Sequence, residues 1–256
     1  VTTCVDMCAP VAFMQKMQAE RVDGVAYDRA DYLSSGIGAT APDSHGTQFG
    51  PVPTLTSPDE ADAFVAARLA EGSDHIKIIY DNFKMFDQAV PALDFATLEA
   101  VITAAQRRNM LAVVHSRDVE AFADVARAGG DGLVHAPVDE VPDGELVAAL
   151  REAGIFVIPT LSVSTPSGTG VAEDPALAPR LSEKELANLR NYSPLHRPGG
   201  DRVSMDAVKA LHEGGVTILA GSDSPNRGTA TGVSIHQELA MLVAAGLTPA
   251  EALAAA

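Results

Sequence analysis

The chain alternates short β-branched runs with amphipathic helical stretches along nearly all of its length. This alternation limits the fold more than any other feature, because strands that alternate with helices usually form a parallel sheet covered by helices. We predict strands at Thr2 to Asp6, Ile37 to Thr40, His75 to Tyr80, Leu111 to His115, Gly132 to His135, Ile155 to Thr160 and Val216 to Gly221. We predict helices at Pro58 to Glu71, Phe95 to Arg108, Val119 to Ala128, Gly144 to Ala153, Met205 to Glu213 and Ile235 to Ala245, and a last one that starts at Pro249.

About seven strands are one short of the eight that close a (β/α)8 TIM-like barrel. The alternative is an open, doubly wound sheet, for which a Gly-x-Gly-x-x-Gly fingerprint would be expected after the first strand, and the chain has none there. We therefore predict that residues 1–256 form a single barrel domain. The segment Ser162 to Arg202 is rich in Pro, Gly and Ser, and we interpret it as a lid with a short helix near Ser182 to Asn191.

The formal net charge of the chain is −16, and such an acidic surface repels phosphate backbones, so we expect no nucleic-acid partner. No apolar run reaches the roughly 18 residues that a membrane helix needs, and no signal-peptide pattern is visible. Cys4 and Cys8 fit neither a zinc spacing nor a disulfide framework, which favours a reducing compartment. We expect a cytoplasmic homo-oligomer that acts on a small molecule, with no membrane partner.

Three predicted strands end in side chains that commonly bind metals. The runs Leu111 to His115 and Asp131 to His135 end in histidine, and the run Val216 to Asp223 ends in aspartate. Barrels of this class place their active sites at the carboxyl ends of the strands, and imidazole and carboxylate suit zinc and similar divalent ions. One such histidine is more often a hydrogen-bonded core residue, but two on neighbouring strands, with aspartate on a third, favour a metal site.

Lys77 lies in the middle of the apolar run His75 to Tyr80, where a bare ammonium group would be costly to bury. Two chemistries would relieve this cost. Addition of CO2 gives an anionic carbamate that can bridge two metals, and reaction with a carbonyl substrate gives a Schiff base. The third interpretation is an edge strand on which Lys77 faces water, and the apolar neighbours disfavour it.

Other polar residues are weaker candidates. Tyr80, Asp81 and Asn82 follow the lysine strand and Asn226 follows Asp223, so we predict that these residues contact substrate. His236 falls within the last long helix, where a packed position is favoured over contact with substrate. The remaining histidines carry no motif, and we interpret them as surface residues: His75, His196 and His212.

Five segments share an order and spacing with a known family: Val1 to Met7, His75 to Ile79, Gly132 to His135, Ile218 to Asn226 and Ser234 to Leu239. They resemble motifs of the amidohydrolase superfamily, in its imidazolonepropionase-like and prolidase-like branch of metal-dependent hydrolases. The resemblance runs from strand two to strand eight of the family's barrel and covers nearly the whole chain.

This resemblance implies a role for each candidate. Lys77 would be the carboxylated lysine that bridges two divalent metals, most simply two zinc ions, and His115 and His135 would hold one of them. Asp223 would bind the other metal, take a proton from the hydroxide that bridges the metals, and pass it to the leaving nitrogen.

The sequence departs from the family in two places. The family carries a His-x-His pair on strand one and a small flanking β-domain, and this sequence has neither, so we interpret it as strands two to eight of a barrel truncated at both ends. His45 lies where the family tends to have a Gly-Gly-His-Gly type of loop near the substrate, but Asp43 and Ser44 differ from it. His45 is therefore either a substrate-binding residue or part of a surface loop.

We predict a metal-dependent hydrolase that cleaves a C–N bond in an amide, peptide, urea or cyclic amide. One alternative is a Schiff-base lyase that uses Lys77 on the same barrel. The other is an inactive, metal-binding barrel remnant that binds ligands.

Overall fold

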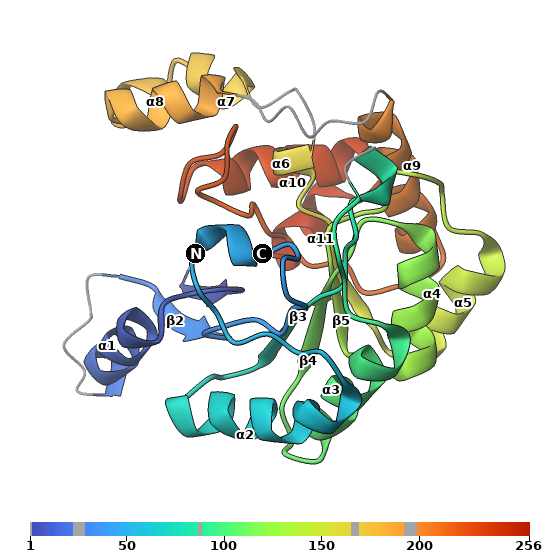
Figure 1. Ribbon diagram of the computed structural model, residues 1–256. Coiled ribbons are helices and arrows are strands. Elements are labelled where there is room, and N and C mark those ends of the chain that lie inside the picture. The colour runs from blue at the N-terminus through green and yellow to red at the C-terminus, as the bar shows by residue number, and fades with distance from the viewer. Residues whose placement is uncertain (1, 23–28, 87–88, 165–168, 192–198) are drawn as a thin grey trace. The chain divides into compact units, whose positions relative to one another are not determined.

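A computed structural model of the chain describes residues 2–22, 29–86, 89–164, 169–191 and 199–256 (Figure 1). The strands are β1 Thr3–Asp6, β2 Asp31–Ser34, β3 Ile76–Ile79, β4 Ala112–His115, β5 Gly132–Val134 and β6 Phe156–Ile158. The α-helices are α1 Val11–Val22, α2 Ala61–Glu71, α3 Phe95–Gln106, α4 Val119–Ala128, α5 Gly144–Glu152, α6 Leu161–Ser164, α7 Thr169–Glu173, α8 Glu183–Arg190, α9 Gly200–Glu213, α10 Ser234–Ala244 and α11 Pro249–Ala254. The 3-10 turns are η1 Thr47–Phe49, η2 Pro58–Glu60, η3 Lys84–Phe86 and η5 Ala178–Arg180.

The described chain divides into two compact units. The first unit comprises Val1–Lys84, Gln88–Ser116 and Ala123–Leu133, and the second comprises Met85–Asp87, Arg117–Phe122 and Val134–Ala256.

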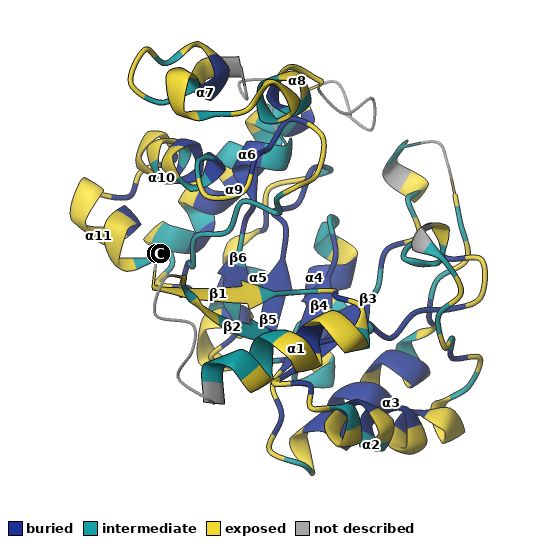
Figure 2. Ribbon diagram, turned by 90° about the vertical axis from the view of Figure 1, so that its left-hand side faces the viewer, coloured by how far each residue is buried: buried dark blue, intermediate teal, exposed yellow. Residues whose placement is uncertain are grey.

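Parallel strands organise the first unit. β1 pairs with β2, and β3 pairs with β4 from Ile76 opposite Ala112 to Ile79 opposite His115. Ala39 adds a parallel bridge to Ile78 on the other side of β3, with hydrogen bonds from Ala39 N to Lys77 O and from Ile79 N to Ala39 O, each 2.8 Å long. β3 and β4 are buried on both faces, as is typical of parallel strands covered by helices (Figure 2).

The second unit continues the same pattern. The strand order of the larger sheet is β3-β4-β5-β6, and β5 lies at the division between the units. His135 N, directly after β5, donates to Ile158 O at the end of β6. Val157 of β6 forms a parallel bridge to Ile218. The larger sheet contains four strands and the smaller one two, so the described residues form an α/β fold with parallel sheets but no closed barrel.

Two of the predicted strands are wrong as strands. The runs Ile37 to Thr40 and Val216 to Gly221 each contribute only a single bridge, at Ala39 and Ile218. The sequence reading also missed β2 and α1. Strand β2 has the sequence Asp-Tyr-Leu-Ser and lacks a β-branched residue, which explains why no strand was predicted there.

The predicted helices are largely confirmed. α4 has the predicted bounds, and the helix expected near Ser182 to Asn191 is α8, capped by the Ser182 hydroxyl, which accepts from Glu185 N. α9 begins at Gly200, five residues before its predicted start. Parts of the predicted lid, and His196, lie outside the described residues.

Burial differs between the strands. β1 is exposed at Thr3, Cys4 and Val5, and Figure 2 shows β1 in yellow and β3 and β4 in dark blue. Cys4 and Cys8 are exposed thiols, and neither forms a disulfide with another described residue. None of the helices in the described ranges is long and apolar enough to cross a membrane.

Candidate active site

Lys77 is buried in the middle of β3, with only 4% of its surface exposed. This excludes the interpretation in which Lys77 faces water. The chain passes close to its side chain at Gly38, where an added Cβ would lie 3.3 Å from Lys77 Cγ and 3.5 Å from Cys8 Sγ. A larger residue at position 38 would therefore press on the lysine stem.

His115 ends β4, opposite Ile79 at the end of β3, and is 5% exposed. Its Nε2 lies 3.2 Å from Oδ2 of Asp81, and the Asp81 side chain is fully buried. Burial lowers the pKa of His115 to about 3; the Asp81 carboxylate opposes this, while His45 and Lys77 add to it. The ring is therefore neutral at pH 7. Because a carboxylate accepts hydrogen bonds, Nε2 carries the proton and Nδ1 has the lone pair that a metal would need.

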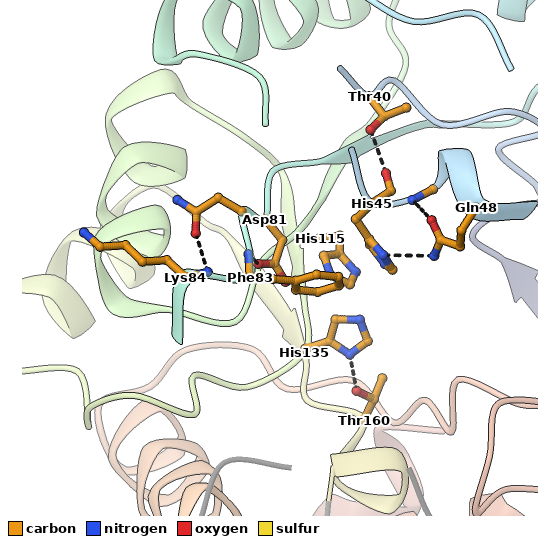
Figure 3. Close-up of polar contacts among 11 residues, drawn as sticks. Thr40, His45, Gln48, Asp81, Phe83, Lys84, His115, His135 and Thr160 are labelled. Carbon is orange, nitrogen blue, oxygen red and sulfur yellow. Dashed lines mark hydrogen bonds and ion pairs between the residues drawn. The ribbon is translucent and has the colours of Figure 1, made fainter. Parts of the chain in front are cut away.

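His45 packs against the same ring. Its centroid lies 4.8 Å from that of His115 and 4.7 Å from that of Phe83, so the loop that carries His45 covers the end of β4 (Figure 3). Gly46 N donates to Gln48 Oε1, and Gln48 Nε2 lies 3.1 Å from His45 Nδ1. The Gln48 amide is thereby oriented so that its nitrogen faces the imidazole. His45 is half-buried, and its role as a substrate-binding residue stays a prediction.

The Tyr80 hydroxyl is engaged within the protein, because it donates to Oδ2 of Asp124 at 2.8 Å. This bond joins the end of β3 to α4 within the first unit. A structural role explains Tyr80 as well as a substrate-binding role does.

In the second unit, His135 follows β5 directly and is 2% exposed. Its Nδ1 lies 2.5 Å from Oγ1 of Thr160, the residue that follows the end of β6 by two positions (Figure 3). The Thr160 hydroxyl fixes the ring, and Nε2 is then the nitrogen that would bind a metal. The sequence reading did not single out Thr160.

Glu238 is a second residue that the sequence reading missed. It lies on α10, is fully buried, and accepts hydrogen bonds from Leu161 N at 3.0 Å and Ser162 N at 2.7 Å. These two amides directly follow Thr160, so the Glu238 carboxylate fixes the backbone at the end of β6. Burial raises the pKa of Glu238 to about 7, against the lowering effect of the two N–H donors.

Asp223 follows the bridge at Ile218 and is only partly buried. Asn226 Nδ2 donates to Asp223 Oδ2 at 2.8 Å and to the Asp223 backbone oxygen at 2.9 Å. The Asn226 amide therefore orients the aspartate, and contact between Asn226 and substrate stays a prediction. The Ser162 hydroxyl donates to Ser222 O at 3.4 Å, which links the segment after β6 to the residue before Asp223.

Two histidines were assigned the wrong environment. His75 is 5% exposed rather than on the surface, and burial lowers its pKa to about 4, with Lys77 as the next cause. His236 is exposed on α10 instead of packed. The helix periodicity of α10 buries Gln237 and Glu238, so the neighbouring position faces outward.

No group of three or more His, Cys, Asp and Glu side chains is arranged to hold a metal among the residues that the structure describes. The donor chemistry nevertheless suits a divalent ion. His115 is neutral, both histidines have one ring nitrogen held by a polar neighbour, and Lys77 would become a carboxylate-like donor once carboxylated. Lys77 and His115 belong to the first unit, and His135 and Asp223 to the second.

The family model for the amidohydrolase family matches residues 1–256. The chain belongs to the amidohydrolase family. Members of this family generally use divalent metals, in keeping with the donor types described above. No curated protein sequence matches this amidohydrolase at a significant level.

Solved structures of similar fold include a Xaa-Pro dipeptidase with methionine bound in its active site, with 21% identity and a TM-score of 0.73. The match covers 99% of this amidohydrolase and 62% of the dipeptidase. A bottromycin amidohydrolase has 20% identity and a TM-score of 0.66, with 100% and 65% of the chains covered. Ochratoxinase of A. niger has 18% identity and a TM-score of 0.70, with 98% and 58% covered.

These likenesses establish a TIM-barrel-like α/β fold for the amidohydrolase chain, in agreement with its parallel sheets. The chain spans about three fifths of the length of the solved structures that it matches.

Proposed function

We propose that this amidohydrolase is a hydrolase that cleaves a C–N bond in a small amide or peptide, with Lys77, His115, His135 and Asp223 as its metal-site residues. The observation that carries the proposal is the burial of Lys77 in β3 and of a neutral His115 at the end of the paired parallel strand β4, in a member of this family. Burying an unmodified ammonium group there has a high desolvation cost, which a carbamate paired with a bound metal would offset.

The side chains supply binding and proton transfer. Asp223 takes a proton from the attacking water and delivers it to the leaving nitrogen, and Asn226 holds one of its oxygens in place. His45 lies over His115 and offers a polar ring to the substrate. A divalent metal, for which we propose zinc, would lower the pKa of the attacking water and polarise the scissile carbonyl when bound.

The substrate class rests on likeness alone. The Xaa-Pro dipeptidase and bottromycin amidohydrolase share the fold, so dipeptides with a carboxyl-terminal proline are the first compounds to test. We also propose that the protein is a cytoplasmic homo-oligomer.

Kinetics of Asp223→Asn test the mechanism. The amide keeps the shape of the side chain but cannot take a proton, so kcat should fall by at least about two orders of magnitude while KM changes far less. Metal content is measured on the same preparation. Full metal occupancy with near-normal kcat would leave Asp223 as a residue that only caps the following turn.

The lyase alternative keeps one supporting fact, the burial of Lys77. A Schiff base formed by Lys77 with a carbonyl substrate would be trapped by borohydride as a covalent adduct, and a hydrolase would give none.

A further inference from the structure

Asn188 of α8 forms several hydrogen bonds with the segment that follows Asp223. Its Nδ2 lies 2.7 Å from Thr229 O, 2.9 Å from Asn226 O and 3.2 Å from Pro225 O. Its own backbone oxygen accepts from Gly228 N at 3.0 Å. One residue of the predicted lid therefore holds the turn 225–229 through both its side chain and its backbone.

The same turn orients the candidate catalytic carboxylate. Asn226 donates its side-chain amide to Asp223 Oδ2, and its backbone N–H bonds to Asp223 O at 3.2 Å. Asn226 thus connects Asn188 to Asp223. Its backbone oxygen accepts a hydrogen bond from Asn188, and its side-chain amide donates one to Asp223.

Apolar packing seats the lid helices on the end of this segment. Val171 of α7 and Leu189 of α8 form a buried cluster with Ala230, and Leu186 and Val233 pack against it. The packing fixes α8 next to residues 230–233, but it does not orient the Asp223 side chain. The hydrogen bonds of Asn188 orient it through Asn226.

We propose that Asn188 is a positioning residue for Asp223: the lid helix α8 holds the turn 225–229 so that Asn226 keeps the Asp223 carboxylate in its working orientation. The inference rests on the proposed role of Asp223 in catalysis. It gives α8 a part in positioning the Asp223 carboxylate, in addition to any role as a cover.

Hydrogen–deuterium exchange of the full-length protein tests the structural half of this proposal. Asn188→Asp keeps the size of the side chain but replaces the amide donor by an acceptor that faces three carbonyl oxygens. We expect exchange of residues 226–229 to become about tenfold faster or more, the change that loss of one or two hydrogen bonds produces. Asn191→Asp, three residues along and exposed, makes the same chemical change and should leave exchange in the turn unaltered.

Faster exchange in α8 alone, with an unchanged turn, would overturn the proposal and leave Asn188 as a residue of lid packing. Asn188→Ala is the second variant; it removes the donor without introducing a charge, and it should speed exchange of the turn in the same place. Since this measurement needs no substrate, it remains decisive even if no dipeptide is hydrolysed, so failure of the proposed function is distinguishable from failure of this inference.

A double-mutant cycle tests the functional half, with the dipeptide that the wild type hydrolyses. Asn188→Ala and Asn226→Ala should each lower kcat by about tenfold with little change in KM, and the double variant should lose scarcely more than either one. Multiplication of the two losses would mean that Asn188 does not act through Asn226.

Discussion

Thr160 has a backbone φ of 50°, a conformation that β-branched residues rarely adopt. His135 and Asp223 share this feature, with φ of 79° and 50°, and His135 directly follows β5. Such conformations cost on the order of 1–3 kcal/mol each and persist where surrounding contacts enforce them. Here the contacts are the Glu238 carboxylate after Thr160 and the Asn226 amide on Asp223. The strained positions include two of the proposed metal-site residues, and Asp43, Phe83 and Asn109 also have a positive φ.

A matched pair of substitutions tests the Thr160 contact with His135. Thr160→Val keeps the shape and removes the hydroxyl, so zinc affinity should fall about 10- to 100-fold, as is typical when the partner of a metal-binding histidine is lost. Thr160→Ser keeps the hydroxyl and removes the β-branch that disfavours this φ, so it should retain the affinity. Competition with a chelator measures both. Equal losses would show that the contact does not orient the ring.

Substitutions of Lys77 test the proposed carbamate. Lys77→Ala should abolish hydrolysis, and a short carboxylic acid such as propionate should restore part of it by replacing the carbamate. Lys77→Met fills the same volume without an amine and leaves no room for the acid, so it should be inactive with and without propionate. Carbon-13 NMR of protein prepared with labelled bicarbonate should show a carbamate signal that Lys77→Met lacks. Absence of that signal from the wild type would contradict carboxylation of Lys77.

His115, His135 and Asp223 were visible in the sequence because each ends an apolar run, and Lys77 because it interrupts one. Their partners were not. Thr160 is 25 residues from His135 and Glu238 is 77 residues from Leu161, so each contact forms only in the tertiary fold, and a positive φ leaves no mark on composition. His75 was misjudged because only the environment of β3, and no local pattern, buries it.

Elements with regular periodicity were predicted well and irregular ones were not. α4 and α8 were found because an amphipathic pattern or a capping serine marks them. The run Val216 to Gly221 reads as a strand, yet only Ile218 makes a bridge. Its last residue shows what the sequence cannot: a Cβ on Gly221 would lie 2.5 Å from Ile158 Cγ2. Close approach to β6 requires glycine there.

Gly221→Ala should therefore destabilise the protein by about 1–3 kcal/mol, because the added methyl group forces Ile158 or the backbone to move. In a chain of this size that corresponds to a fall in Tm of a few degrees, on the order of 2–4 °C per kcal/mol. Gly144→Ala is the control; its Cβ would meet nothing within 4 Å at the start of α5, and its Tm should stay the same or rise slightly. Equal shifts in the two variants would contradict the close contact.

The sequence predicted both the α/β fold with parallel strands and membership of the amidohydrolase family, because each depends on repeated local patterns. The prediction of a single domain and of a missing first strand remains a prediction. The net charge of the sequence does not reveal that one acidic side chain is buried, where it joins α10 to the end of β6. That acid, Glu238, makes the stability of the fold depend on pH.

The sign follows from its pKa, which burial raises from 4.5 to about 7 in the folded protein. Between these values the folded state holds a proton that the unfolded state has released, so stability falls as pH rises. The contribution is complete below pH 4.5 and is lost above about pH 7, where the cost reaches on the order of 3 kcal/mol. Glu238→Gln cannot ionise, so it should lack this loss, although its amide also weakens one backbone hydrogen bond at every pH.

Urea denaturation of the metal-free protein at pH 5, 6, 7 and 8 measures the difference. Chelator is present because a cation near Asp223, whose charge also raises the pKa of Glu238, would shift the titration. The free energy of unfolding of the wild type should fall relative to that of Glu238→Gln by on the order of 3 kcal/mol across this range. Parallel pH curves for the two proteins would mean that Glu238 is ionised in both states, with its charge fully stabilised by the amides of Leu161 and Ser162.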